Sequence, residues 1–100
     1  MGSGIQNKYG RAVDEVLAIV KAAATKFPTW PDDPLHAMAI VGEEFGEAMM
    51  SCLQCVYEPH KSNPVELRLE VQQTAAMCLR FLRSLETGRY KFRKGPQHDV

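Results

Sequence analysis

The sequence predicts an all-α protein, an antiparallel helical bundle of three main helices whose four-helix core is completed by oligomerisation. Apolar residues recur at three- and four-residue steps over three long segments, as they do in amphipathic helices. Two proline-containing breaks, at residues 27–31 and 58–63, separate these segments. The chain has 100 residues, enough for one small domain, and helices this long leave apolar surface that so short a chain does not cover alone.

The first helix is expected over residues 5–26, with residues 1–4 interpreted as left over from cloning. Its apolar stripe consists of Tyr9, Val13, Val16, Leu17, Val20 and Ala24. Pro28 and Pro31 then prevent the helix from continuing, because proline has no backbone N–H and disfavours helical geometry in the residue before it. An ordered, aromatic loop is expected there.

The second helix is expected over residues 34–57, with Asp33 as its N-cap and Pro34 at its first position. One broad apolar face contains Leu35, Met38, Ala39, Gly42, Phe45, Met49 and Leu53. Glu44 and Glu47 fall on roughly the opposite side, with Ile40 and Ser51. A helix that is apolar on one side and mixed on the other is expected to be covered on both, which makes this the central helix.

The third helix is expected over residues 64–86, with Asn63 and Glu66 forming a start that resembles a capping box and Gly88 ending it. Its predicted buried face contains Leu67, Val71, Thr74, Cys78, Phe81, Leu82 and Leu85. The side chains predicted to lie outside are Arg68, Gln72, Arg80 and Arg83. The helical domain therefore covers residues 5–88, and residues 89–100 form a basic C-terminal tail.

Composition narrows the class of protein. The net charge is zero, which argues against a partner that is a nucleic-acid polymer. No segment approaches the roughly 20 apolar residues that span a bilayer, and no signal sequence is present, so we expect no membrane association and a cytoplasmic location. Three cysteines, an odd number, fit reduced thiols; Cys52 and Cys55 have a metal-like spacing, but both lie mid-helix, which favours packed thiols.

Acidic residues on the second and third helices form the main chemical pattern. Glu44 and Glu47 lie one turn apart on one helix face, as do Glu70 and Gln73 on the next helix. Carboxylates at this spacing repel each other unless a cation lies between them. An all-oxygen ligand set favours magnesium, with manganese as the other possibility. Glu43 points about 100° away from Glu44, so it is expected to orient a ligand or a basic residue, or to help activate water, rather than to bind the same ion.

The pattern Glu-Glu-x-x-Glu at residues 43–47, followed after 22 residues by Glu70-x-x-Gln73, resembles the signature of the all-α nucleoside triphosphate pyrophosphohydrolases, the MazG-like superfamily. The resemblance covers most of residues 5–86. It implies magnesium-dependent cleavage of a (deoxy)nucleoside triphosphate to the monophosphate and pyrophosphate, in a house-cleaning role. The implied catalytic residues are Glu43, Glu44, Glu47 and Glu70. The implied metal ligands are Glu44, Glu47, Glu70 and Gln73.

Several alternatives stay open. The family has aspartate where this chain has Gln73, so a catalytically silent member that binds nucleotide or a protein is a second hypothesis. A solvated acidic helix face on a structural bundle is a third. Substrate contacts are assigned to Trp30, Lys91, Arg93 and Lys94, although Trp30 beside two prolines is also typical of a lid on a bundle. The excess apolar surface predicts a homodimer or homotetramer.

Overall fold

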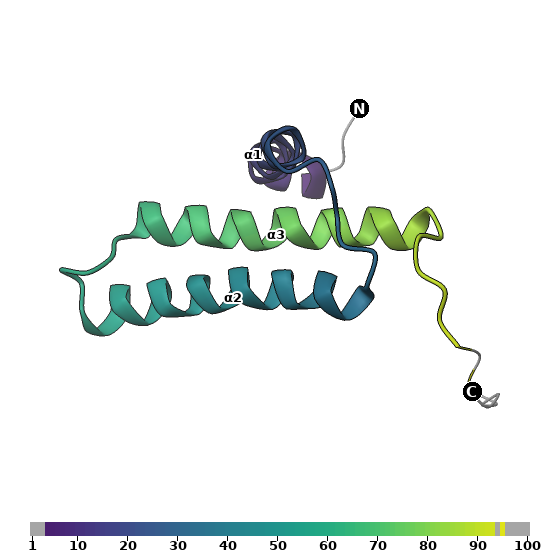
Figure 1. The fold of residues 1–100 in the computed structure, drawn as a ribbon. Helices are drawn as coiled ribbons and strands as arrows, with labels where there is room; N and C mark the ends of the chain where they lie inside the picture. The colour runs from purple at the N-terminus through teal and green to yellow at the C-terminus, as the bar shows by residue number, and fades with distance from the viewer. Residues whose placement is uncertain (1–3, 94, 96–100) are drawn as a thin grey trace.

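The computed structural model describes residues 4–93 and 95, and these residues form three helices and no strand. The helices are α1 (Gly4–Lys26), α2 (Pro34–Tyr57) and α3 (Pro64–Glu86), as Figure 1 shows. The predicted all-helical class is confirmed, and the predicted bounds agree except that α1 begins one residue earlier. Within the described residues, no helix has the length and apolarity needed to cross a membrane.

Helix α3 is the central element of the fold. It packs against both other helices, whereas α1 and α2 do not pack directly on each other. In Figure 1, α2 and α3 run antiparallel across the view while α1 is seen nearly end-on, so α1 crosses α3. The prediction of a fully antiparallel bundle with the second helix at its centre is therefore wrong in these two details. The loop of residues 27–33 explains the turn, because its two prolines prevent the chain from continuing as helix.

Capping residues fix the ends of α2 and α3 as predicted. The Asp33 side chain accepts a hydrogen bond of 2.9 Å from the Leu35 N–H, and the Asn63 side chain accepts one of 2.9 Å from the Glu66 N–H. Glu66 is bonded through its side chain to the Ser62 hydroxyl at 3.2 Å. Its carboxylate therefore secures the turn before α3 and lies outside the acidic cluster described below.

The core is small and lies at the end of the α2–α3 pair where the loop of residues 27–33 returns. Trp30, Ala37 and Tyr90 are buried there. The half-buried side chains packed on them are Ile40, Met77 and Phe81. At the other end of the pair, the hydroxyls of Ser51 and Ser62 are buried and hydrogen-bonded at 2.7 Å.

Helix α2 packs on α3 through the side opposite its large apolar residues. The residues that are buried are small or branched: Ala37, Val41, Ala48 and Ser51. The predicted apolar face is exposed in this chain, with Leu35, Met38, Phe45, Met49 and Leu53 all at least 43% accessible. Small side chains let the two helices approach closely, which explains why this face is the one in contact. The outer apolar face has no cover within the described chain.

Two predictions about α3 are also wrong in part. Val71, Leu82 and Leu85 are exposed, although they were expected on the buried face. Gln72 and Arg80 are half-buried, although they were expected outside. The cause is that α1 and the loop of residues 27–33 cover the side of α3 that carries these polar residues.

A polar clamp centred on Glu15 joins α1 to α3. Its carboxylate accepts hydrogen bonds from Arg68 at 2.8 Å and from Gln72, and it pairs with Arg11 at 2.9 Å within α1. These donors, above all Arg68, lower the pKa of Glu15 to about 2. The apolar contribution of α1 is modest, because Val16 and Val20 are half-buried while Tyr9, Val13 and Leu17 are exposed.

Candidate metal centre

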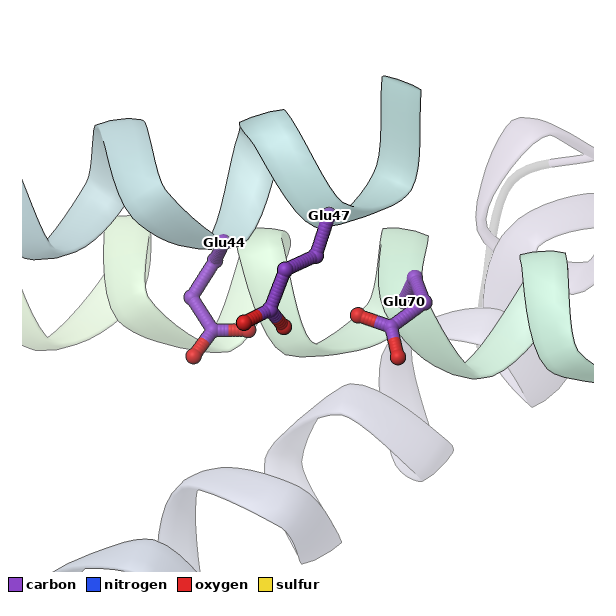
Figure 2. A group of neighbouring side chains, drawn as sticks. All are labelled: Glu44, Glu47 and Glu70. Carbon is purple, nitrogen blue, oxygen red and sulfur yellow. The ribbon is translucent and has the colours of Figure 1, made fainter. Parts of the chain in front are cut away.

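Three carboxylates from two helices converge between α2 and α3. Glu44 and Glu47 lie one turn apart on α2, and Glu70 lies on α3. One oxygen from each side chain lies within 4.8 Å of the other two. In Figure 2, the Glu44 and Glu47 side chains extend from α2 toward α3, and the Glu70 carboxylate is directed toward Glu47. The structure thus brings together three of the four glutamates that the sequence pattern singled out.

Two of these carboxylates are partly withdrawn from water, and each has one oxygen that gains no partner. Glu44 and Glu70 are half-buried, and one oxygen of each, Oε2, is buried without a hydrogen-bond partner in the part of the chain that the structure describes. Burial raises the pKa of Glu44, and the charges of Glu47, Glu70 and Glu43 raise it further. Burial raises the pKa of Glu70 as well, as does the adjacent Glu47 carboxyl. The protein therefore holds acidic groups where their charged form is disfavoured.

A divalent cation fits this arrangement chemically. A buried polar oxygen without a partner costs free energy, on the order of 1–3 kcal/mol and more for a charged group. The unpartnered oxygens of Glu44 and Glu70 belong to the same cluster, and every donor atom in it is a carboxylate oxygen. Hard cations such as magnesium and manganese prefer such ligands. The residues present therefore fit the cation that the acidic pattern predicts.

The two remaining residues of the motif lie beside the cluster. Gln73 is half-buried on α3, one turn after Glu70, and lines the same cleft as Glu44. It brings an amide oxygen without charge. Glu43 is exposed on α2 and is not part of the carboxylate cluster, in agreement with its expected direction.

A cleft of about 640 Å³ begins beside the cluster. Glu44 and Gln73 lie in its wall, and the loop of residues 27–33 forms the far end. The rest of the wall comes from all three helices: Ile19 and Ala23 of α1, His36 and Ile40 of α2, and Met77 and Arg80 of α3. The cleft is thus mostly apolar, with charged groups at both ends.

The residues assigned to substrate contact lie in different surroundings. Trp30 is in the cleft wall but is only 7% exposed, with the Arg80 guanidinium 5.0 Å from its ring centroid. This burial favours the lid interpretation over a free stacking surface. Lys91 and Arg93 are exposed on the segment after α3, and Lys94 lies outside the described residues. His36 is exposed and lines the cleft.

Two residues of the cleft, Phe27 and Arg80, were not among the site residues predicted from the sequence. Phe27 is 60% exposed at the cleft, which makes it the accessible aromatic ring there. Arg80, expected outside, is half-buried and donates a 2.7 Å hydrogen bond to the Phe27 carbonyl; burial lowers its pKa. Arg80 lies seven residues after Gln73, which is about two helical turns, so the two residues share a face of α3. That spacing could have predicted that Arg80 lies at the cleft.

The cysteines do not form a second site among the described residues. All three are free thiols. Cys55 and Cys78 are half-buried, which fits packed thiols, whereas Cys52 is exposed and in this respect differs from the expectation.

Comparison of the chain with protein-family models, with curated proteins and with solved structures found no match.

Proposed function

We propose that this chain is a magnesium-dependent nucleoside triphosphate pyrophosphohydrolase of the MazG-like kind. The single observation that carries the proposal is the convergence of Glu44, Glu47 and Glu70 within 4.8 Å, with two unpartnered oxygens, at one end of a cleft of about 640 Å³. In the reaction, water adds to the α-phosphorus and the bond to the bridging oxygen breaks. The products are a nucleoside monophosphate and pyrophosphate.

The carboxylates support this reaction only together with a cation, because a polyphosphate and three glutamates repel each other. Glu44, Glu47 and Glu70 would hold magnesium, and Gln73 supplies a neutral oxygen beside them. When bound, magnesium neutralises phosphate charge and stabilises charge on the leaving pyrophosphate. Glu43, which is exposed next to the cluster, is assigned to orienting water.

The cleft supports binding of a nucleoside next to the phosphates. Its apolar wall and the exposed ring of Phe27 offer stacking surface for a base, and Arg80 offers a cation at the far end. Trp30 forms the wall behind them, and Lys91 and Arg93 remain candidates for phosphate contact. The substrate class we propose is modified or surplus nucleoside triphosphates, met in the cytoplasm.

A second candidate function follows from Gln73. Metal affinity at such sites depends on the number of charged ligands, and this cluster has three carboxylates and one neutral amide. A chain that binds nucleotide with magnesium but does not cleave it is the alternative. Thermal stabilisation by nucleotide and magnesium without release of pyrophosphate would identify it.

Self-association belongs to the same proposal, because the outer face of α2 fits a second copy. Gly42 and Gly46 lie in the middle of this face, and a Cβ built on either would meet nothing within 4 Å. Glycine inside a helix costs up to about 1 kcal/mol relative to alanine, and no contact among the described residues explains the two glycines. A helix of a second copy seated on the glycines and on the exposed Phe45 and Met49 would do so, in a homodimer or a dimer of dimers.

The experiment is a pyrophosphate-release assay over a panel of unmodified and modified triphosphates, with and without magnesium. Activity should need magnesium and fall by about 100-fold or more in Glu44→Gln and in Glu47→Gln, because each removes a charged ligand. The matched control is Glu86→Gln, an exposed acid on α3 that lies outside the cluster. Full activity in Glu44→Gln, or none in the unaltered protein, would contradict the proposed enzyme.

A further inference from the structure

We propose that Arg89 and Tyr90 are positioning residues that hold the loop of residues 27–33 in place and so set the shape of the cleft. They belong to the segment after α3, which was predicted to be a basic C-terminal tail. The loop contributes Phe27, Trp30 and Asp32 to the cleft wall. The expected effect on substrate affinity rests on the proposed function, whereas the effect on loop position does not.

Three side chains, those of Arg80, Arg89 and Tyr90, donate hydrogen bonds to backbone carbonyls of the loop. Arg89 donates to the Trp30 carbonyl at 2.5 Å and to the Asp32 carboxylate at 2.8 Å. The Tyr90 hydroxyl donates to the next carbonyl, that of Pro31, at 2.8 Å. Arg80 holds the carbonyl of residue 27 in the same way. Each contact joins positions more than 50 residues apart in sequence, so none of them is a local turn.

The end of α3 aims these residues at the loop. Gly88 has a φ of +69°, a left-handed conformation that glycine adopts without strain. The N–H of Arg89 then bonds back to the Ser84 carbonyl at 3.1 Å, which reverses the chain beside the helix end. Tyr90 follows into the core, where it is 8% exposed and its ring lies edge-on to Phe81 with centroids 5.8 Å apart.

The loop depends on these side-chain hydrogen bonds because its own backbone forms few hydrogen bonds. Among the described residues, no backbone–backbone hydrogen bond involves residues 28–32, and Pro28 and Pro31 have no N–H to donate. Loss of Arg89 would leave the Trp30 carbonyl without its donor and release Asp32. The carboxylate cluster is built on α2 and α3 and does not include the loop, so its geometry should remain.

Trp30 is the only tryptophan in the chain, so its fluorescence reports the loop directly. We would compare Arg89→Ala and Tyr90→Phe with the matched control Arg83→Ala, which removes an exposed arginine of α3. Both test variants should show red-shifted emission and stronger quenching by acrylamide, measured well below the melting temperature. Arg89→Lys keeps the charge but not the two-pronged geometry, and should fall between Arg89→Ala and the unaltered protein.

Kinetics and metal titration distinguish a displaced loop from a general loss of structure in the variant protein. For Arg89→Ala, KM should rise about tenfold while kcat stays within about twofold, because loop position affects binding more than the chemical step. Binding of manganese alone, titrated by its paramagnetic signal, should match that of the unaltered protein. Should Arg89→Ala fail to fold, Tyr90→Phe, which removes one hydroxyl, carries the same measurements.

The outcomes distinguish this inference from the proposed function. Unshifted Trp30 emission in both variants would overturn it, as would a shifted emission with unchanged KM, or a metal affinity that falls together with substrate affinity. If the unaltered protein cleaves no triphosphate, the proposed function fails, and the fluorescence comparison alone then decides whether Arg89 and Tyr90 position the loop.

Discussion

At the scale of single residues, the unpartnered Glu44 oxygen predicts opposite effects of one substitution with and without metal. In the metal-free protein, Glu44→Gln removes a charge that burial and Glu47 disfavour, so the melting temperature should rise. With magnesium at about 100 times its dissociation constant, the unaltered protein should gain about 2.7 kcal/mol, and the variant should lose that gain. Calorimetry with and without magnesium measures both.

The control for this prediction is Glu86→Gln, which should respond to magnesium like the unaltered protein. A Glu44→Gln variant that melts lower without metal, and keeps its magnesium response, would show that the carboxylate stabilises the fold and does not bind the ion.

Glu15 predicts a loss of stability at acid pH. Its pKa is lowered to about 2 from an ordinary value near 4.5, so its contribution to stability is present above pH 4.5 and is lost as the pH falls toward 2. Glu15→Gln should therefore lower the melting temperature at pH 7 and have little further effect near pH 2. Thermal melts from pH 7 to pH 2 measure this; a constant difference between the two proteins across the range would contradict it.

The neutral side chain of Gln73 is expected to limit the metal affinity of the cluster. Gln73→Asp adds a fourth carboxylate beside the cluster, which should tighten manganese binding by about tenfold, since affinity follows ligand charge. Without metal the same change adds repulsion and should lower the melting temperature. A titration with Mn²⁺ measures the affinity, and unchanged binding would place Gln73 outside the coordination sphere.

At the scale of elements, local signals predicted the helices because each helix end depends on its own neighbours. The side chains of Asp33 and Asn63 cap α2 and α3, and Gly88, which has no Cβ, takes the positive φ that follows the end of α3. The packing faces were harder to predict. Hydrophobicity favoured the Phe45 and Met49 side of α2, but the small residues opposite, such as Ala48, are the ones that approach α3.

The same division between local and distant signals applies to the candidate site. Glu44, Glu47 and Glu70 were predictable because helical spacing and one short connection place them together. Helical spacing from Gln73 gives the face of α3 on which Arg80 lies. The partners of Arg80, Arg89 and Phe27 were not predictable, because they depend on the path of the loop between α1 and α2. That path is set by contacts between residues more than 50 positions apart, which no periodicity encodes.

Gly88 and Gly10 predict opposite results for the same substitution. Among the described residues, a Cβ built on either glycine meets nothing within 4 Å beyond its chain neighbours and its own helix backbone, so the backbone conformation decides the outcome. Gly88→Ala forces alanine into a positive φ and should cost about 1 kcal/mol, whereas Gly10→Ala in α1 should gain up to about 1 kcal/mol. Urea denaturation measures both free energies of unfolding; equal signs would contradict the prediction.

At the scale of the whole molecule, the exposed apolar area is large for so small a chain. Side chains of all three helices contribute to it, and α2 contributes the continuous outer face centred on Gly42 and Gly46. Exposed apolar patches of this kind mark interfaces, because leaving them in water is unfavourable. The acidic cluster lies on the opposite side of α2, so self-association through the outer face would leave the cleft open.

The outer face of α2 predicts the oligomeric state. Met49→Glu places a charge in the centre of this face, where desolvation would disfavour it in a dimer, and should convert the protein to a monomer. Val65→Glu is the matched control, because Val65 is exposed in the first turn of α3, away from the outer face. Light scattering after size exclusion, at several concentrations, measures the mass. An unaltered protein that is already monomeric, or a Met49→Glu variant of unchanged mass, would show that this face is not the interface.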